Sequence, residues 1–211
     1  MATRIGLVSD VHASPKALAE ALDLFASHGV HEIICAGDIA GYHEPLLPTV
    51  RLLRQAGCKA VAGNHDQYWL AENAARGNPE IIEYLGGLPP TLDLDIEGQR
   101  IFVVHANPPS EQHGGIKLRN RDGDIEDARK QPWREALRDF EPEVLIVGHT
   151  HQVYAERLGT TLVINPGSVP FNHSCMILDL PSLQVEVFAL GGREIIYSWN
   201  FSVWQKEQAG K

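Results

Sequence analysis

Cysteine, long apolar runs and basic charge are all scarce in this 211-residue sequence. The three cysteines, Cys35, Cys58 and Cys175, form no CxxC pair, and an odd count without a motif fits a reducing compartment. Cys35 lies within an apolar run, so we expect it to be a small residue of the core. No apolar stretch approaches about 18 residues, the length that indicates a membrane-spanning helix.

Basic residues are outnumbered by acidic ones, 18 to 27, which gives a formal charge of -9. That balance argues against an extended nucleic-acid surface, which requires a basic face. It permits a small phosphate ester bound through metal ions, because cations reverse the local field. The sequence begins Met-Ala-Thr-Arg and enters an apolar run without a signal peptide. We therefore expect a cytoplasmic protein that has no membrane partner.

Strand and helix patterns alternate in the first sixty residues. The length of the chain and its 44% hydrophobic content predict a single domain over residues 1–211. Ser14 and Pro15 have the pattern of a helix N-cap and first turn, and Gly29 that of a helix end. Strands are expected at 5–9, 33–36 and 59–62, and helices at 15–28 and 46–55. Such alternation predicts parallel strands joined by helical crossovers.

The second half of the sequence has the pattern of antiparallel strands. A short helix is expected at 78–85, followed by a hairpin of 91–96 with 101–104 and a buried strand at 144–147. A run of antiparallel strands is expected at 153–157, 161–164, 175–180 and 185–190. Alternation from Ile195 to Val203 predicts a half-buried strand at an edge or a subunit contact. Residues 106–131 form a long polar stretch, which is usually functional or mobile.

Five of the apolar runs end at residues that can bind a metal ion or transfer a proton. In chain order these motifs are Asp10-Val11-His12, Gly37-Asp38, Gly63-Asn64-His65-Asp66, His105 and Gly148-His149-Thr150-His151. Ligand crevices of open α/β sheets lie at the carboxyl ends of the strands, so we expect the five motifs to meet in space. His149 and His151 would share one face if they lie in a strand.

The chemistry of these side chains indicates a metal centre. The seven candidate ligands offer oxygen and nitrogen but no thiolate, which suits Mn, Fe, Zn, Co or Ni: Asp10, His12, Asp38, Asn64, His105, His149 and His151. Seven are too many for one ion and suit two, the usual device for phosphoester hydrolysis. Each motif alone has a simpler interpretation as a loop cap, a turn or a hydrogen-bonded histidine. Their joint occurrence favours the metal centre.

The ordered motifs resemble the calcineurin-like metallophosphoesterase superfamily, and in particular its small single-domain bacterial and archaeal phosphodiesterases. The resemblance spans about residues 4–180. It implies an α/β fold, a four-layer αββα sandwich with mixed sheets. It also implies a binuclear centre of divalent transition metals, with manganese favoured and iron, zinc, nickel or cobalt as alternatives. A hydroxide held by the metals would hydrolyse a small phosphoester substrate.

The resemblance also implies a role for each residue. The first ion would be held by Asp10, His12 and His151, the second by Asn64, His105 and His149, and Asp38 would bridge the two. His65 would protonate the leaving alcohol or stabilise the transition state. Asp66 would orient His65, and a loop cap is the alternative.

Three departures from the family pattern imply a reshaped substrate pocket: Ala13, Ala106-Asn107 and the segment 169–173. Extra histidines at His43, His113 and His173 are interpreted as surface or packing residues. Lys117, Arg119 and Arg121 could hold a phosphate, although a solvated loop is favoured. Trp199 and Trp204 fit either a homodimer contact or core packing. Two other functions stay open, a phosphomonoesterase such as a phosphoprotein phosphatase, or a non-catalytic scaffold that binds proteins.

Overall fold

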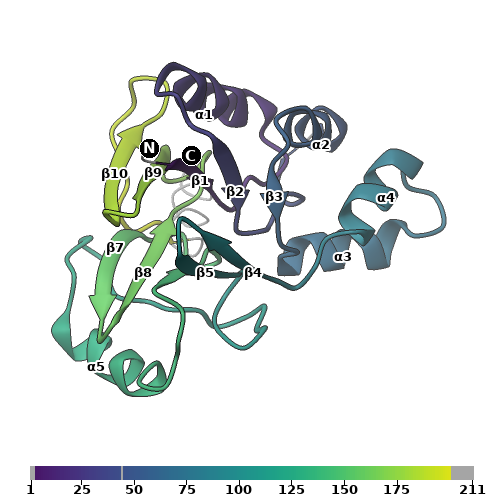
Figure 1. The fold of residues 1–211 in the computed structure, drawn as a ribbon. Coiled ribbons are helices and arrows are strands. Elements are labelled where there is room, and N and C mark those ends of the chain that lie inside the picture. Colours follow the sequence, from purple (N-terminus) through teal and green to yellow (C-terminus); the bar gives the residue numbers. More distant parts are fainter. Residues whose placement is uncertain (1–2, 44, 201–211) are drawn as a thin grey trace.

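Two five-stranded mixed sheets pack face to face at the centre of the computed structural model, which describes residues 3–43 and 45–200 (Figure 1). The strand order is β10-β9-β1-β2-β3 in the first sheet and β4-β5-β6-β8-β7 in the second. Helices and a long irregular segment cover the two outer faces. The expected α/β fold, a four-layer αββα sandwich, is confirmed.

The strands of the first sheet are β1 (Thr3–Val8), β2 (Glu32–Cys35), β3 (Lys59–Ala60), β9 (Ser174–Leu180) and β10 (Gln184–Ala189). Those of the second are β4 (Thr91–Ile96), β5 (Gln99–Val104), β6 (Val144–Ile146), β7 (Val153–Leu158) and β8 (Thr161–Pro166). The helices are α1 (Pro15–Ser27), α2 (Leu46–Gln55), α3 (Asn64–Asn73), α4 (Pro79–Gly86) and α5 (Asp127–Ala136). No helix among the described residues is long and apolar enough to cross a bilayer.

The parallel part of each sheet sets the position of the site. β1, β2 and β3 run parallel, and so do β5, β6 and β8, whereas β9, β10, β4 and β7 pair in the antiparallel sense. The crossover helix α1 lies close to β1 because Gly6 has no side chain: a Cβ there would lie 2.7 Å from the Phe25 ring. Ser14 precedes α1 without capping it, since its hydroxyl donates to the His12 carbonyl.

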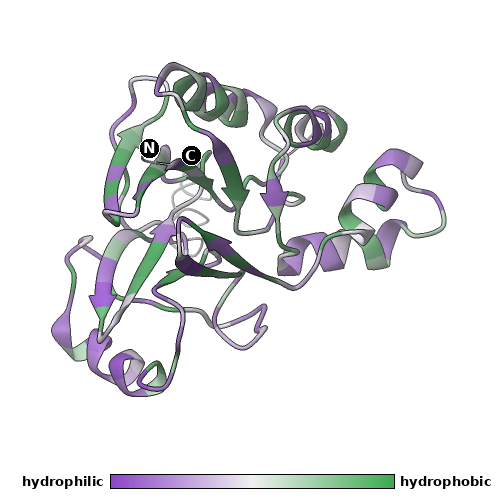
Figure 2. Cartoon of the chain, in the orientation of Figure 1, coloured by the Kyte–Doolittle hydropathy of each residue, from purple (hydrophilic) through white to green (hydrophobic). Residues whose placement is uncertain are grey.

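The alternation of apolar side chains explains the layers. In β5, Ile101 and Val103 point into the core between the sheets, whereas Phe102 and Val104 pack against the outer layer. β6 repeats the pattern, because successive side chains of a strand lie on opposite faces. Figure 2 shows the resulting band of hydrophobic strands, with hydrophilic segments on the helices outside it. Strands covered on both faces read as continuous apolar runs, which is how the sequence identified them.

Two helices were not predicted. α3 begins within the GNHD motif, and α5 begins inside the stretch expected to be a loop up to residue 131. Neither has a broad apolar face: α5 contains no buried residue. The rest of the expected loop is packed more closely against the fold than its polar composition indicated. Ile116 and Leu118 are fully buried against the outer face of the second sheet.

Two further expectations need correction. The four late strands do not form one antiparallel run: β7 and β8 belong to the second sheet, and β9 and β10 to the first. No strand forms over residues 195–200, where a single bridge joins Ser198 to Gln152. Phe201, Val203 and Trp204 of the expected C-terminal strand lie outside the described residues.

Candidate metal centre

The five motifs meet between the two sheets, at the carboxyl ends of β1, β2, β3, β5 and β6. Each comes from a segment that directly follows a strand of the central layers. Six of the seven candidate ligands are buried: Asp10, His12, Asp38, Asn64, His105 and His151. The convergence expected from the topology is therefore confirmed.

One cluster contains Asp10, His12 and His151, each with a ligand atom directed at the same small space. His151 Nε2 lies 3.2 Å from Asp10 Oδ1 and 3.1 Å from His12 Nε2. The third edge, between His12 Nε2 and Asp10 Oδ1, is 4.0 Å. Ligand atoms about 2.0–2.2 Å from one ion lie roughly 3 Å apart, so these spacings suit a single divalent cation.

A second cluster contains Asp38, His105 and His149, with Asn64 beside it. His105 Nε2 lies 3.3 Å from Asp38 Oδ2 and 3.2 Å from Asn64 Oδ1, and His149 Nδ1 lies 2.9 Å from the same amide oxygen. These spacings again suit one ion. Asp38 also groups with His12 of the first cluster, together with His65. The two clusters are thus adjacent, and Asp38 lies where a bridging carboxylate would be needed.

The Asn64 amide provides a test of fit. Its oxygen faces the two imidazoles, and rotating the amide by half a turn would let the NH₂ donate to both nitrogens instead. Without a cation the rotated form satisfies more hydrogen bonds. A cation shared with His105 and His149 would select the orientation with the oxygen inward, because a metal requires the lone pairs of all three atoms. The residues present therefore fit a metal.

Contacts outside the clusters orient the imidazoles. His12 Nδ1 lies 3.2 Å from the carbonyl oxygen of Ala40, and His105 Nδ1 lies 2.7 Å from that of Ala36. An N–H at Nδ1 that donates to a carbonyl leaves the Nε2 lone pair directed into the centre, the usual arrangement for metal-binding histidines. Asp10 accepts hydrogen bonds from the Ser9 hydroxyl at 2.6 Å and from the backbone N–H of His149.

Three of the buried groups have the charge that a cation site needs, and His105 carries a proton at pH 7 that a metal ion would displace. Burial alone would raise the pKa of Asp10, but His151 and the other imidazoles outweigh it and hold the pKa far below its ordinary value. Burial lowers the pKa of His12 to about 3 and that of His149 to about 4, so both rings are neutral at pH 7. Burial also disfavours the charged form of His105, yet Asp38 outweighs it and raises the pKa to about 9.

The backbone at the centre is strained. Five candidate ligands have positive φ angles between 46° and 63°: Asp10, His12, Asp38, His149 and His151. The left-handed region costs roughly 1–2 kcal/mol for residues other than glycine, and such strain persists where function requires it. The HxH pair was expected to share one face of a strand, and this is wrong. Both histidines follow β6 in a loop, and its left-handed turns direct them to different clusters.

The glycines of the motifs are needed for close approach. A Cβ on Gly63 would lie 2.1 Å from Asp38 Oδ1, and one on Gly148 would lie 2.0 Å from Ser9 Oγ and 2.7 Å from Asp10 Oδ2. Contacts under 3.0 Å force a shift of the neighbouring atoms. The GNHD and GHTH motifs therefore carry glycine to make room for the carboxylates of other motifs.

His65 lies at the opening of the centre. Its backbone N–H donates to Asp38 Oδ1 at 2.9 Å, and its ring makes edge contacts with His12 and Tyr42. No hydrogen bond joins its ring nitrogens to another described residue. The ring lines a cavity of about 350 Å³ together with Asp38, Asn64, His149 and His151. It can therefore reach a molecule bound there.

Asp66, at the start of α3, makes its hydrogen bonds to the backbone. Its carboxylate is buried at the start of α3, where it accepts hydrogen bonds from the backbone N–H groups of Ala40 at 2.7 Å and Gly63 at 2.9 Å. Asp66 is the third residue of the helix and Gly63 its N-cap, so the carboxylate closes the first turn. These contacts fit the loop-cap interpretation, and no hydrogen bond joins the carboxylate to the His65 ring.

An aromatic wall beside the centre was not predicted. Phe171 stacks on Trp199 with ring centroids 4.2 Å apart, and both rings contact His151. Tyr42 contacts His12 and Phe171. Phe171 belongs to the segment 169–173 that departs from the family pattern, and this departure was the available signal. The ring contacts of Trp199 within the chain fit the core-packing alternative.

The extra histidines have different surroundings. His113 lies near the centre, with its ring 6.0 Å from His149 and 6.1 Å from Tyr68. His43 contacts Phe171 and is exposed, and His173 faces the Glu194 carbonyl. None belongs to a ligand cluster among the described residues. Their interpretation as surface or packing residues fits these positions.

Comparison with known proteins agrees with the geometry. Residues 3–181 match the model of the calcineurin-like phosphoesterase superfamily domain. The phosphodiesterase YfcE of Escherichia coli K12 is 28% identical over 171 residues, which cover 79% of each chain. A protein of Methanocaldococcus jannaschii without an assigned function is 25% identical over 187 residues, 78% of this chain and 69% of that one. A metallophosphoesterase from Sphaerobacter thermophilus has the same fold, with a TM-score of 0.66 at 22% identity over 99% of this chain and 95% of that one.

Proposed function

This chain belongs to the calcineurin-like phosphoesterase superfamily, and from that premise we propose that it is a phosphodiesterase with a centre for two divalent metal ions. One observation carries the proposal: two clusters of buried carboxylate and imidazole ligands adjoin at Asp38, each with donor atoms about 3 Å apart. The similarity to the phosphodiesterase YfcE supports the reaction class. We favour manganese, since these oxygen and nitrogen ligands suit it.

The reaction divides between the ions and the protein. Two bound divalent ions would lower the pKa of a water for attack on phosphorus and offset the charge of the phosphoryl oxygens. His65, on the open side of the centre, would donate a proton to the departing alcohol oxygen. The fixed carbonyl contacts of His12 and His105 keep their lone pairs in place, so the ligands need little rearrangement.

The charge around His65 favours a diester over a monoester. Among the described residues that line the cavity at the centre, Lys117 is the one cationic side chain, and none is an arginine. A terminal phosphate carries up to two negative charges and is usually held by arginine in bidentate fashion. A diester carries one negative charge, and two alcohol groups are esterified to its phosphorus. No described residue of this cavity supplies the arginine that a monoesterase would use.

Hydrolysis of bis-p-nitrophenyl phosphate and of p-nitrophenyl phosphate tests the proposal. Metal-stripped protein would be re-supplied with Mn, Fe, Ni, Co, Zn or Mg in turn, and bound metal would be counted by mass spectrometry. We expect two ions per chain, activity that returns with metal, and a preference for the diester. His65→Ala should lower kcat at least a hundredfold and leave the metal content unchanged, because a general acid contributes about 10²–10⁴-fold.

His43→Ala is the matched control, since His43 is exposed and outside the ligand clusters. It should retain the wild-type rate. A preference for the monoester would replace the diesterase with a phosphomonoesterase. Two bound ions without activity on either ester would refute the enzyme proposal and favour a non-catalytic scaffold.

A further inference from the structure

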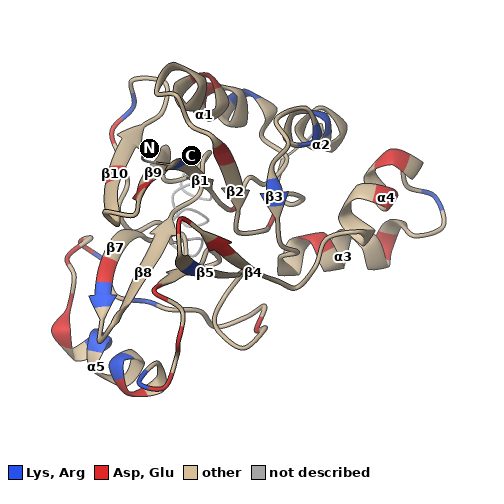
Figure 3. Cartoon of the chain, in the orientation of Figure 1, with Lys and Arg blue, Asp and Glu red and all other residues tan. Residues whose placement is uncertain are grey.

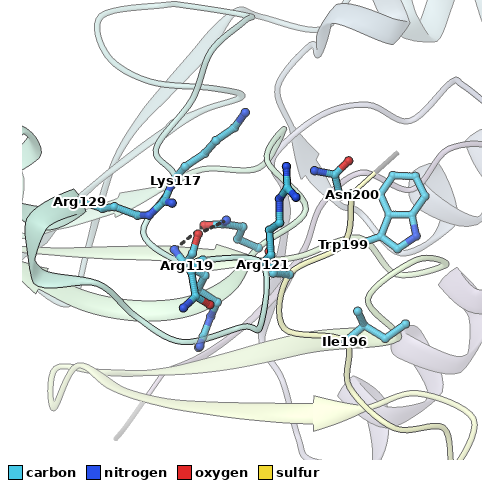
Figure 4. A pocket seen from close by; sticks show the side chains of 10 residues that line it. Lys117, Arg119, Arg121, Arg129, Ile196, Trp199 and Asn200 are labelled. Carbon is cyan, nitrogen blue, oxygen red and sulfur yellow. Dashed lines mark hydrogen bonds between the residues drawn. The ribbon is translucent and has the colours of Figure 1, made fainter. Parts of the chain in front are cut away.

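A second cavity adjoins the metal centre, and the charged residues that line it within the described part of the chain are all basic. Its volume is about 480 Å³, and its cations are Lys117, Arg119, Arg121 and Arg129 (Figure 4). The chain as a whole has a charge of -9, and Figure 3 shows acidic and basic segments interspersed over the helices and strands in view. Four cations around one hollow therefore depart from the general character of the protein.

Two of these cations are engaged by the protein. Arg119 donates from Nε to the Val153 carbonyl at 2.7 Å and from its guanidinium to the Gly123 carbonyl, and it lies over the Tyr197 ring. Arg129 pairs with Glu126. These contacts make Arg119 part of the wall and partly neutralise Arg129.

The other two cations have no such partners. Lys117 and Arg121 are exposed and form no ion pair or hydrogen bond with another described residue. Figure 4 shows both side chains extending to the same side of the cavity. Lys117 is directed outward because Ile116 and Leu118, its neighbours in an extended segment, are buried in the core. Two cations that line one hollow and have no partner among the described residues favour an anionic ligand.

The basic cavity is fixed to the metal centre. Gln152 follows the ligand His151 directly, and its side-chain oxygen accepts hydrogen bonds from the backbone N–H groups of Leu118 and Arg119 at 2.9 and 3.0 Å. Its amide nitrogen donates to the Arg119 carbonyl at 3.0 Å. Trp199 donates its backbone N–H to the His151 carbonyl at 3.1 Å. The walls of the basic cavity are thus bonded to a segment that supplies candidate ligands.

The two cavities are also continuous. Both are lined by Lys117, Gln152, Ser198, Trp199 and Asn200. A ligand with its phosphodiester at the metal centre can therefore extend past Lys117 toward Arg121. We propose that the basic cavity binds a second phosphate of the substrate, so that the substrate is a phosphodiester with a phosphate on one of its two alcohol arms. This inference rests on the proposed diesterase function.

The chemistry of the cations determines the class of ligand. Arginine and lysine form charge-assisted hydrogen bonds with phosphate oxygens, and Arg121 can offer two parallel donors to one phosphate. Hydrogen bonds to charged groups are worth roughly tenfold in affinity each. A diester without a second charge would forgo both and would be a poorer substrate.

Two substrates with the same reporter test the proposal: thymidine 5′-(p-nitrophenyl phosphate) and its 3′-phosphorylated form. They differ in the second phosphate alone. We expect the wild-type kcat/KM to be at least tenfold higher for the phosphorylated one, mainly through KM. Arg121→Gln and Lys117→Gln should each reduce this ratio about tenfold. The control Arg138→Gln removes an exposed arginine outside the cavity and should leave the ratio unchanged.

A binding measurement separates this inference from the proposed function. Calorimetry with thymidine 3′,5′-bisphosphate and metal-stripped protein needs no catalysis, and thermal unfolding confirms that each variant is folded. Binding that weakens about tenfold in Arg121→Gln supports the basic site, whether or not the nucleotides are hydrolysed. Failure to hydrolyse either nucleotide would refute only the proposed diesterase function. Hydrolysis with equal kcat/KM for the two nucleotides, or a ratio that both variants retain, would overturn the second phosphate site.

Discussion

Replacement of Asp66 by alanine should destabilise the fold at the start of α3 without removing a group that takes part in the chemistry of His65. The Asp66 carboxylate is the buried acceptor for two backbone N–H groups, those of Ala40 and Gly63. A buried donor that loses its acceptor costs about 1–3 kcal/mol, so the variant should lose roughly 2–6 kcal/mol of unfolding free energy. A domain is typically stable by about 5–15 kcal/mol, so the loss is a large fraction of the total.

Urea unfolding at neutral pH measures the loss, with activity assayed in parallel at a temperature where the variant is folded. Asp66→Asn keeps one acceptor oxygen and should have intermediate stability. The matched control is Asp127→Ala, because Asp127 is also an acidic residue in the first turn of a helix but has an exposed side chain. It should lose less than about 1 kcal/mol. An Asp66→Ala variant of wild-type stability with a hundredfold lower kcat would refute this reasoning and restore a direct role toward His65.

The remaining predictions concern the centre itself. Gly63→Ala should lower metal occupancy and activity at least a hundredfold, because its Cβ would lie 2.1 Å from Asp38 Oδ1. The control is Gly86→Ala, whose Cβ meets no atom within 4 Å. It should bind as much metal as the wild type. The pKa of His105 is raised from 6.5 to about 9, so this ring stabilises the metal-free fold below pH 6.5 and that contribution is lost as the pH rises through 9. Metal binding at pH 7 should therefore release about one proton, seen by calorimetry in buffers of different ionisation enthalpy, and no release would contradict the assignment. Metal-free protein should lose stability as the pH falls from 6.5 toward 4, because His12 and His149 are neutral in the fold and become protonated on unfolding, and a flat acid unfolding profile would contradict this.

The sequence predicted the parts of the fold whose signal is local. Strands buried on both faces appear as continuous apolar runs, and each motif residue follows such a run at the carboxyl end of a strand. Leu46–Gln55 was predicted with the bounds that the structure has. The hairpin was also predicted, although the Glu97-Gly98 turn is tighter than expected because both residues adopt positive φ angles. These features depend on a few neighbouring residues, which a single sequence displays.

The missed features depend on contacts between distant segments. α5 has no buried residue, so its sequence lacks the apolar stripe that identifies a helix. The role of Asp66 depends on the Ala40 N–H, 26 residues away, which no local pattern reveals. Lys117 and Arg121 were interpreted as parts of a solvated loop because acidic residues balance them in the sequence. In the structure those acids do not line the cavity, so the balance along the chain does not hold in space.

The motif residues are costly to the fold in the absence of a cation. Asp10 and Asp38 are buried as charged groups, and five candidate ligands adopt left-handed backbone angles. Neither feature improves packing, and the core between the sheets is formed by other residues of the same strands, such as Ile5 and Ile101. The fold therefore separates two tasks along each strand: side chains within the strand stabilise the sandwich, and side chains just beyond its carboxyl end form the centre. That separation explains why conservative changes in the core and in the motifs should have different consequences, the first on stability and the second on metal binding.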